Sequence, residues 1–278
     1  MGYDIIIPSA SRPHLLHRTL TTMFQFLRPW PDRLLIHDDA AFPQEQKRIE
    51  GVLGECVPPS VDVICQLDNP PIFHGPALHW LLNRVEGRYC FYTQDDFEFL
   101  RYIPLLQSFE MLEDYDLHHI RFNKRKTMPY KHEGEKRWYK REMYFHKGQH
   151  VMGEPGRHHE DWAGLPGQVL TVSDHWYFQA SVWRISQIKP VVEAWMGRNP
   201  GGFRTLPEIS INKSLNGEIP EIRQLLENKI QLPPDGSRSS DQEIRAEYQK
   251  TFIWGGIGEK PYIKHLGHDQ SEWARPRG

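Results

Sequence analysis

The feature that most constrains the fold of this chain is the alternation of short apolar runs with amphipathic segments over its first hundred residues. Four runs rich in β-branched or aromatic residues predict strands, at residues 4–9, 32–39, 60–68 and 88–96. Segments with apolar residues at helical spacing separate them and predict helices at residues 11–27, 42–56 and 75–87. Strands that alternate with helices predict a parallel, doubly wound α/β sheet.

Each of the four predicted strands ends in polar residues. The pairs are Pro8-Ser9, Asp38-Asp39, Asp68-Asn69 and Asp95-Asp96. Ligands of open α/β sheets bind at the carboxyl ends of the strands, so we expect these side chains to meet at one edge. Two adjacent carboxylates repel each other, so the doublet after "YCFYTQ" indicates a bound cation, a helix cap or exposure to water.

Beyond residue 100 the pattern changes. Residues 103–115 predict a helix, residues 169–186 become strand-like and then helix-like, and residues 204–217 predict a helix that starts near Pro207 and ends at Gly217. At the start of the first helix, Ser11 is a candidate cap and Pro13 suits the first turn.

Composition excludes some classes of protein. The formal net charge of −2 excludes a polycation over the whole molecule. Three cysteines, two of them inside apolar runs, have no metal or redox spacing, which predicts reduced thiols in a cytoplasmic protein. The first residues lack the pattern of a signal peptide, and no apolar run reaches the length of about 18 residues that a membrane span needs.

Three stretches, taken in order, carry a resemblance to a known family. "PSASRP", "LLIHDDA" and "HGPALHWLLNRVEGRYCFYTQDD" resemble the nucleotide-sugar-binding half of family 2-like glycosyltransferases with the GT-A fold. The resemblance covers residues 3–100. It implies a GT-A-like (Rossmann-like), mixed and mostly parallel sheet flanked by helices in a single domain, residues 1–278. Residues 1–100 would bind the donor, and residues 101–278 would form an irregular acceptor-binding and catalytic half with a C-terminal tail.

The resemblance also implies which residues bind the nucleotide-sugar donor, most simply a UDP-sugar. Asp38 or Asp39 would accept hydrogen bonds from the base or ribose, and Arg12 would pair with the diphosphate. Asp95 would contact the ribose or an ordered water. The full implied set is Pro8, Ser9, Ser11, Arg12, Asp38, Asp39, His74, Gly75 and Asp95.

A divalent cation is the second implication of the resemblance. Mn²⁺ or Mg²⁺ bound to a diphosphate stabilises its growing charge and prefers hard oxygen ligands. The family's Asp-x-Asp element stands here as Gln94-Asp95-Asp96, with Asp96 as the predicted ligand. His265 and His268 in "KHLGHDQS" are candidate imidazole ligands, as in some metal-using relatives. "RHHEDW", residues 157–162, lacks the second cluster that a zinc site needs.

An inverting transfer needs a general base for the acceptor hydroxyl. Glu208 in "TLPEIS" lies at the start of a predicted helix, where the family places its catalytic acid, and Asp174 in "SDHWYF" is the second candidate. A glutamate in a first helical turn also complements the helix dipole without any catalytic role. A retaining transfer would need no such base, and the sequence leaves the stereochemistry open.

The acceptor is predicted from a basic stretch. Residues 121–147 hold ten Lys or Arg against three Glu, with aromatic residues between them. Arg125, Lys126, Trp176 and Tyr177 are the predicted acceptor-binding residues. The excess of positive charge in this stretch suits an anionic acceptor, such as modified DNA or a phosphorylated glycan. Two other functions remain open, a metal-dependent phosphoesterase or nuclease and a nucleic-acid-binding α/β protein without catalysis.

Overall fold

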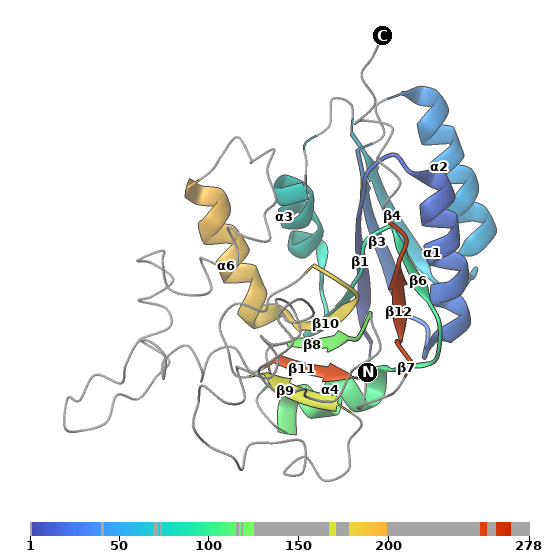
Figure 1. The fold of residues 1–278 in the computed structure, drawn as a ribbon. Coiled ribbons are helices and arrows are strands. Elements are labelled where there is room, and N and C mark those ends of the chain that lie inside the picture. The colour runs from blue at the N-terminus through green and yellow to red at the C-terminus, as the bar shows by residue number, and fades with distance from the viewer. Residues whose placement is uncertain are drawn as a thin grey trace, which may run out of the picture.

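The structure is a computed structural model, and Figure 1 shows its ribbon. The part that it describes comprises residues 2–39, 42–68, 72, 74–114, 117, 119–124, 167–170, 178–198, 251–254 and 260–267. Over these residues, none of the helices has both the length and the apolar character that crossing a membrane requires.

The centre of the described part is an eight-stranded sheet. From one edge to the other its strands are β4 (Asp62–Leu67), β3 (Arg33–Asp38), β1 (Asp4–Ser9), β5 (Tyr89–Tyr92), β10 (Ser181–Arg184), β8 (His119–Phe122), β11 (Thr251–Trp254) and β9 (Gly167–Leu170). The first four strands are all parallel, and β8 and β11 are parallel to each other. β10 runs antiparallel to both its neighbours, and β9 runs antiparallel to β11. The predicted mixed, mostly parallel α/β sheet is confirmed.

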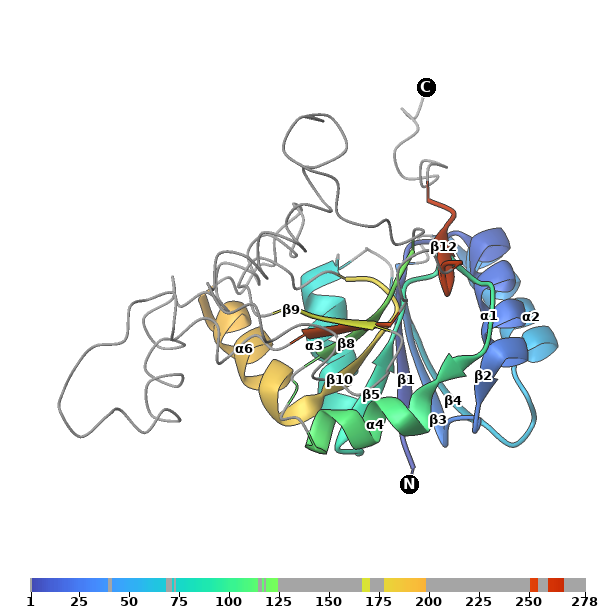
Figure 2. The ribbon, with the colours of Figure 1, turned by 60° about the horizontal axis from the view of Figure 1, so that its bottom comes forward.

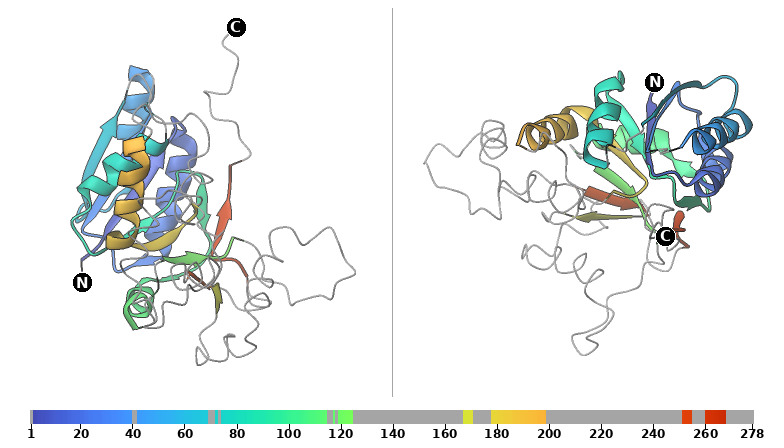
Figure 3. Two further views of the ribbon diagram at one scale, coloured as in Figure 1. Left: turned by 90° about the vertical axis from the view of Figure 1, so that its left-hand side faces the viewer. Right: turned by 90° about the horizontal axis from the view of Figure 1, so that it is seen from above.

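Helices cover both faces of this sheet. α1 (Pro13–Phe26) and α2 (Pro43–Cys56) pack on one face, whereas α3 (His74–Arg84) and α6 (Ile185–Arg198) lie on the other, as the view from above in Figure 3 shows. α4 (Leu105–Asp114) crosses one end of the sheet near the amino terminus (Figure 2). There the Phe109 ring packs on Tyr3 and Tyr89, with centroid distances of 5.3 and 5.2 Å.

The two-sided cover explains why the strands read as continuous apolar runs. Side chains alternate between faces along a strand, so Ile5 and Ile7 of β1 face α1 and α2 while Ile6 faces α3 and α6. All three are fully buried. Burial of one such side chain stabilises the fold by about 1.5–3 kcal/mol, so the core residues of these few strands account for much of the driving force.

Two short pairs of strands lie beside the main sheet, and the apolar pattern predicted neither. β6 (Phe97–Phe99) pairs with β12 (Ile263–His265) in antiparallel register, which puts His265 opposite Phe97. β2 (Leu27–Arg28) pairs with β7 (Ile103–Pro104). The first pair brings a segment near the end of the chain next to the Asp95-Asp96 doublet.

Several local predictions were wrong. Arg12, not Ser11, is the N-cap of α1, because Ser11 turns its hydroxyl to the Asp39 carbonyl instead. α3 begins at His74, so His74 and Gly75 lie in its first turn rather than in a turn before it. The same helix ends at Arg84, before Gly87. The prediction of a single domain over residues 1–278 is not tested by the described part.

Candidate functional site

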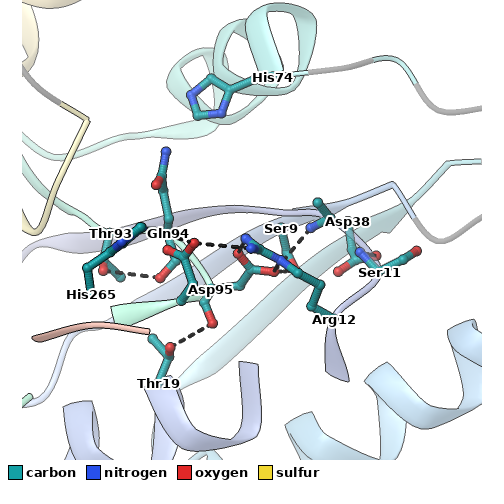
Figure 4. A network of polar contacts seen from close by, with 12 residues as sticks. Ser9, Ser11, Arg12, Thr19, Asp38, His74, Thr93, Gln94, Asp95 and His265 are labelled. Atoms are coloured by element: carbon teal, nitrogen blue, oxygen red, sulfur yellow. Dashed lines mark hydrogen bonds and ion pairs between the residues drawn. The ribbon is translucent and has the colours of Figure 1, made fainter. Parts of the chain in front are cut away.

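The ends of β1, β3 and β5 meet at the carboxyl edge of the sheet, as predicted. Register places Ser9 beside Asp38 and Ile6 beside Tyr92, so the residues after β5 follow close to Ser9. The Ser9 hydroxyl donates to Asp95 Oδ2 at 3.1 Å, and the Ser11 amide donates to Asp38 Oδ1 at 3.2 Å. Figure 4 shows these side chains in one polar network. Pro8 precedes this network inside β1.

The turn between β1 and α1, residues 9–12, is shaped by one unusual backbone conformation. Ser11 has φ of 53°, in the left-handed region that non-glycine residues rarely adopt. Its amide bonds Asp38, and its hydroxyl donates to the Asp39 carbonyl at 2.8 Å, which holds the conformation in place. The turn therefore sends the Arg12 side chain back over the strand ends.

Asp95 is the anchored member of the acid pair, as we term Asp95 and Asp96. It is 1% exposed, and both carboxylate oxygens are engaged. Oδ2 accepts from Ser9, from the Ala10 amide at 3.2 Å and from Arg12 Nε at 3.1 Å, while Oδ1 accepts from Arg12 Nη2. Thr19 of α1 donates to the Asp95 carbonyl at 2.8 Å. Asp95 thus joins β1, α1 and the end of β5.

Asp96 is buried but only partly satisfied. Its Oδ2 accepts from Arg12 Nη1 at 3.1 Å and lies 3.3 Å from His265 Nε2. Within the described part of the chain, its Oδ1 is buried without a hydrogen-bond partner. Burial favours the neutral acid, but the contacts with His265 and Arg12 outweigh it and lower the pKa of Asp96. Asp96 is therefore a carboxylate at neutral pH, and one of its oxygens bonds none of the residues that the structure describes.

The C-terminal segment, residues 260–267, closes over the acid pair. The Leu266 amide donates to the Asp96 carbonyl at 2.7 Å, directly after the pairing of β12 with β6. Gly267 lies so close that a Cβ there would overlap Asp96 Oδ2 and come within 2.8 Å of His265 Nε2. Only glycine fits this close approach without displacing its neighbours.

Asp38 and Asp39 lie next to each other but point to opposite faces of the sheet. Asp38 is fully buried on the α1 face, and its Oδ2 has no hydrogen-bond partner among the residues that the structure describes. Burial raises the pKa of Asp38 to about 7. On the other face, Asp39 Oδ1 accepts from the Ile72 amide at 3.1 Å. His37, also on that face, bonds Asp68 Oδ2 through Nε2 at 2.8 Å.

His74 stands apart from this network in Figure 4. It begins α3, its Nε2 lies 3.4 Å from the Tyr92 hydroxyl, and its ring packs on Phe178 at 4.9 Å. Burial lowers the pKa of His74 to about 4, so the ring is neutral at neutral pH. Gly75 is buried in the same helical turn.

Other predicted residues lie outside the described part of the chain. They are Glu208, Asp174, His268, Trp176, Tyr177, Arg125 and Lys126. At the described edge of the basic stretch, Arg121 is buried within β8 at 4% exposure, so it does not belong to an exposed basic surface. The prediction of a basic acceptor surface therefore starts at Lys124 at the earliest.

Two residues of the site were missed in the sequence. Thr19 lies on the buried side of α1 together with Thr22. The Thr19 hydroxyl donates to the Asp95 carbonyl, and the Thr22 hydroxyl accepts from the Phe99 amide of β6. A pair of threonines at i and i+3 on an otherwise apolar helix face was the available signal. Gly267 had no comparable signal, because its closeness to Asp96 depends on strand pairing across more than 160 residues.

No protein-family model matches the chain, and no curated protein matches it. Solved structures similar to it include S. aureus TarS 1-349 in complex with UDP-GlcNAc, at 10% identity and a TM-score of 0.49, covering 99% of this chain and 62% of that one. A second is S. aureus TarS, at 11% identity and a TM-score of 0.48, covering 96% of this chain and 37% of that one. A third is the mannosyltransferase PcManGT from Pyrobaculum calidifontis in complex with GDP-Man and Mn²⁺. Its identity to this chain is 8% and the TM-score is 0.46, and the match covers 87% of this chain and 77% of that one.

The protein thus spans less than two thirds of the TarS chains to which it is similar. With identities near 10% and TM-scores below 0.5, these structures do not identify the activity of this protein, which has to be inferred from its own side chains.

Proposed function

We propose that this protein is a glycosyltransferase that moves a sugar from a nucleotide-sugar donor to a hydroxyl group of an acceptor. The observation that carries the proposal is the meeting of Asp38, Arg12 and the acid pair at the carboxyl edge of parallel strands. This edge is where open α/β sheets bind their ligands. Acids and a partly buried arginine at one such edge suit a ligand that combines a sugar or nucleoside with phosphate groups.

The residues at Asp96 fit a hard divalent cation, Mn²⁺ or Mg²⁺. Asp96 is a buried carboxylate with an unpartnered Oδ1, and the His265 imidazole lies beside its other oxygen. Such ions use one or two protein ligands and complete their shells with phosphate oxygens and water. Once bound, the cation would stabilise the negative charge that develops on the departing diphosphate.

The other described residues would hold the donor. Arg12 presents a planar guanidinium, which matches phosphate oxygens in a charge-assisted fork. Asp38 or Asp39, at the end of β3, would accept hydrogen bonds from the base or the ribose. His74 and Gly75 would line the same nucleoside end from α3. A donor held at both ends in this way has its anomeric carbon oriented for attack.

Attack by the acceptor needs a proton acceptor. We assign this role to Glu208 and name Asp174 as its alternative, because a carboxylate near the acceptor hydroxyl removes its proton as the new bond forms. Arg125, Lys126, Trp176 and Tyr177 would bind an anionic acceptor by charge pairing and ring stacking. A Glu208→Ala protein that transfers sugar at the wild-type rate would exclude Glu208 from this role.

The two competing functions have less support. A metal-dependent phosphoesterase or nuclease needs several clustered carboxylates or histidines. Among the residues that the structure describes, no group of three or more His, Cys, Asp or Glu side chains could hold a metal ion. Binding of nucleic acid without catalysis would leave a buried, partly unpaired Asp96 without a purpose.

A thermal-shift panel tests the proposal. UDP, GDP, UDP-GlcNAc and GDP-mannose are each added with and without Mn²⁺ to wild-type, Asp96→Ala and Glu98→Ala proteins. We expect one nucleotide to raise the melting temperature only with Mn²⁺, and we expect Asp96→Ala to abolish this rise. Glu98 is the matched control because it lies two residues away and pairs with Arg18 instead. The absence of a rise with every nucleotide would refute the proposed function.

A further inference from the structure

We infer that Arg12 and the divalent cation compete for Asp96, so that the cation binds well only when a nucleoside diphosphate draws the Arg12 guanidinium away. This inference rests on the proposed function and adds an order to its binding steps. It concerns the state without a donor, in which Arg12 itself is the counter-cation of the acid pair.

The contacts of Arg12 show how completely it fills that role. Arg12 Nε donates a hydrogen bond to Asp95 Oδ2, and Arg12 Nη2 donates to Asp95 Oδ1. Arg12 Nη1 donates to Asp96 Oδ2 at 3.1 Å. The Arg12 side chain is 14% exposed, and those of Asp95 and Asp96 are 1% and 7% exposed. Water therefore screens these charges weakly, and each acts strongly on its neighbours.

A divalent cation at Asp96 would meet Arg12 at close range. Two carboxylates and one guanidinium leave a single net negative charge, apart from His265, and a divalent ion would reverse the sign of the site. Repulsion between the ion and Arg12 therefore opposes binding of metal alone. A diphosphate removes this obstacle, because it offers Arg12 new anionic oxygens and offers the ion further ligands.

The surrounding structure allows Arg12 to move while the acids stay in place. Asp95 remains held by Ser9 and by the Ala10 amide, and the Asp96 backbone remains held by the Leu266 amide. The backbone carbonyl of Arg12 accepts hydrogen bonds from the amides of Leu15 and Leu16 in α1, so the main chain stays fixed at this point. Only the long side chain has to swing, and it carries a charge that a diphosphate can receive.

Such competition predicts a measurable coupling between two ligands. If Arg12 opposes the metal only in the absence of nucleotide, nucleotide must strengthen metal binding, and metal must strengthen nucleotide binding by the same factor. Loss of the Arg12 charge should relieve the opposition and reduce this factor. The direction is opposite to that of an ordinary binding residue, whose removal weakens both ligands.

The test measures the dissociation constant of Mn²⁺, by its electron paramagnetic resonance signal, with and without UDP and, separately, GDP. Wild-type, Arg12→Gln, Arg12→Lys and Arg18→Gln proteins are compared, after circular dichroism has established that each is folded. Arg18 is the matched control because it is an exposed arginine of the same helix that pairs with Glu98.

We expect Arg12→Gln to bind Mn²⁺ alone about tenfold more tightly than wild type, and to lose at least about fivefold of the nucleotide-dependent gain. Arg12→Lys keeps the charge, so it should retain most of the wild-type coupling, and Arg18→Gln should equal wild type.

An unchanged gain in folded Arg12→Gln, or weaker binding of Mn²⁺ alone, would overturn the inference and leave the proposed function standing. A wild-type protein that binds no Mn²⁺ with either nucleotide would overturn both.

Discussion

Two segments from opposite ends of the chain meet at the acid pair, and they differ in what they leave unsatisfied. The turn at residues 9–12 engages both oxygens of Asp95. The C-terminal segment, residues 260–267, covers Asp96 and leaves one of its oxygens buried with no hydrogen-bond partner in the described part of the chain. The two adjacent aspartates thus have different roles. Asp95 builds the site, and Asp96 remains available to a ligand.

The largest expected effect tests this division through stability. Asp95→Asn removes one member of a buried ion pair and leaves Arg12 without its main partner, so we expect the free energy of unfolding to fall by about 4 kcal/mol. Asp96→Asn loses weaker contacts, and we expect a fall of about 1 kcal/mol. Urea unfolding of both variants at pH 7 measures the difference.

Equal losses of unfolding free energy in the two variants would contradict the contrast between Asp95 and Asp96, because Asp96 would then stabilise the fold as much as Asp95 does. A larger loss in Asp96→Asn would mean that Asp96, not Asp95, is the acid that stabilises the site. In Asp96→Asn, the Mn²⁺-dependent rise in melting temperature on addition of nucleotide should also disappear.

The turn at residues 9–12 also affects stability through Asp38, whose carboxyl accepts the Ser11 amide. Its folded pKa of about 7 lies above the ordinary aspartate value of 3.8, so the folded protein holds a proton that the unfolded chain releases. Stability is then lost as the pH rises from about 4 to about 7. Each pKa unit corresponds to about 1.4 kcal/mol, and relaxation around a buried charge reduces the total, so we expect about 2 kcal/mol.

Asp38→Asn keeps the shape of the neutral acid and cannot ionise. The difference between the unfolding free energies of wild type and variant should therefore grow from pH 4 to pH 7 in favour of the variant. Other acids of the protein titrate equally in both chains and cancel in this difference. A constant difference would show that Asp38 is already ionised in the fold at low pH.

The sequence predicted the part of the site that is formed by the ends of the parallel strands. Short, continuous apolar runs and intervening helical segments placed the four parallel strands and their polar ends, including Ser9, Asp38 and the acid pair. Strand ends of a parallel sheet meet at one edge, and the contacts among these residues follow.

The sequence did not predict how the acid pair is shared between Arg12 and the end of the chain. A strand of three residues, such as β12, has too short a pattern to reveal its partner β6. His265 was named from a family resemblance, and its position opposite Phe97 follows only from the observed register. The left-handed conformation of Ser11 was missed for a related reason, because it is held by bonds to β3 rather than by its own preference.

The smallest expected effect concerns how closely the C-terminal segment presses on Asp96. Gly267→Ala would place a methyl group against Asp96 Oδ2 and His265, so the segment must shift away. We expect the Mn²⁺-dependent affinity for nucleotide to fall about tenfold, or about 1.4 kcal/mol. Isothermal titration calorimetry with UDP or GDP in the presence of Mn²⁺ measures it.

Gly54→Ala is the matched control, since the same methyl group on α2 would meet no atom of the described residues within 4 Å. In a helix interior alanine is preferred over glycine, so this variant should gain about 0.5–1 kcal/mol in stability and bind nucleotide as wild type does. If Gly267→Ala behaved in the same way, the C-terminal segment would not be held against Asp96, and the contrast between the two segments would be lost. A loss of affinity in Gly267→Ala alone, with unfolding little changed, means that the segment's closeness serves the ligand rather than the fold.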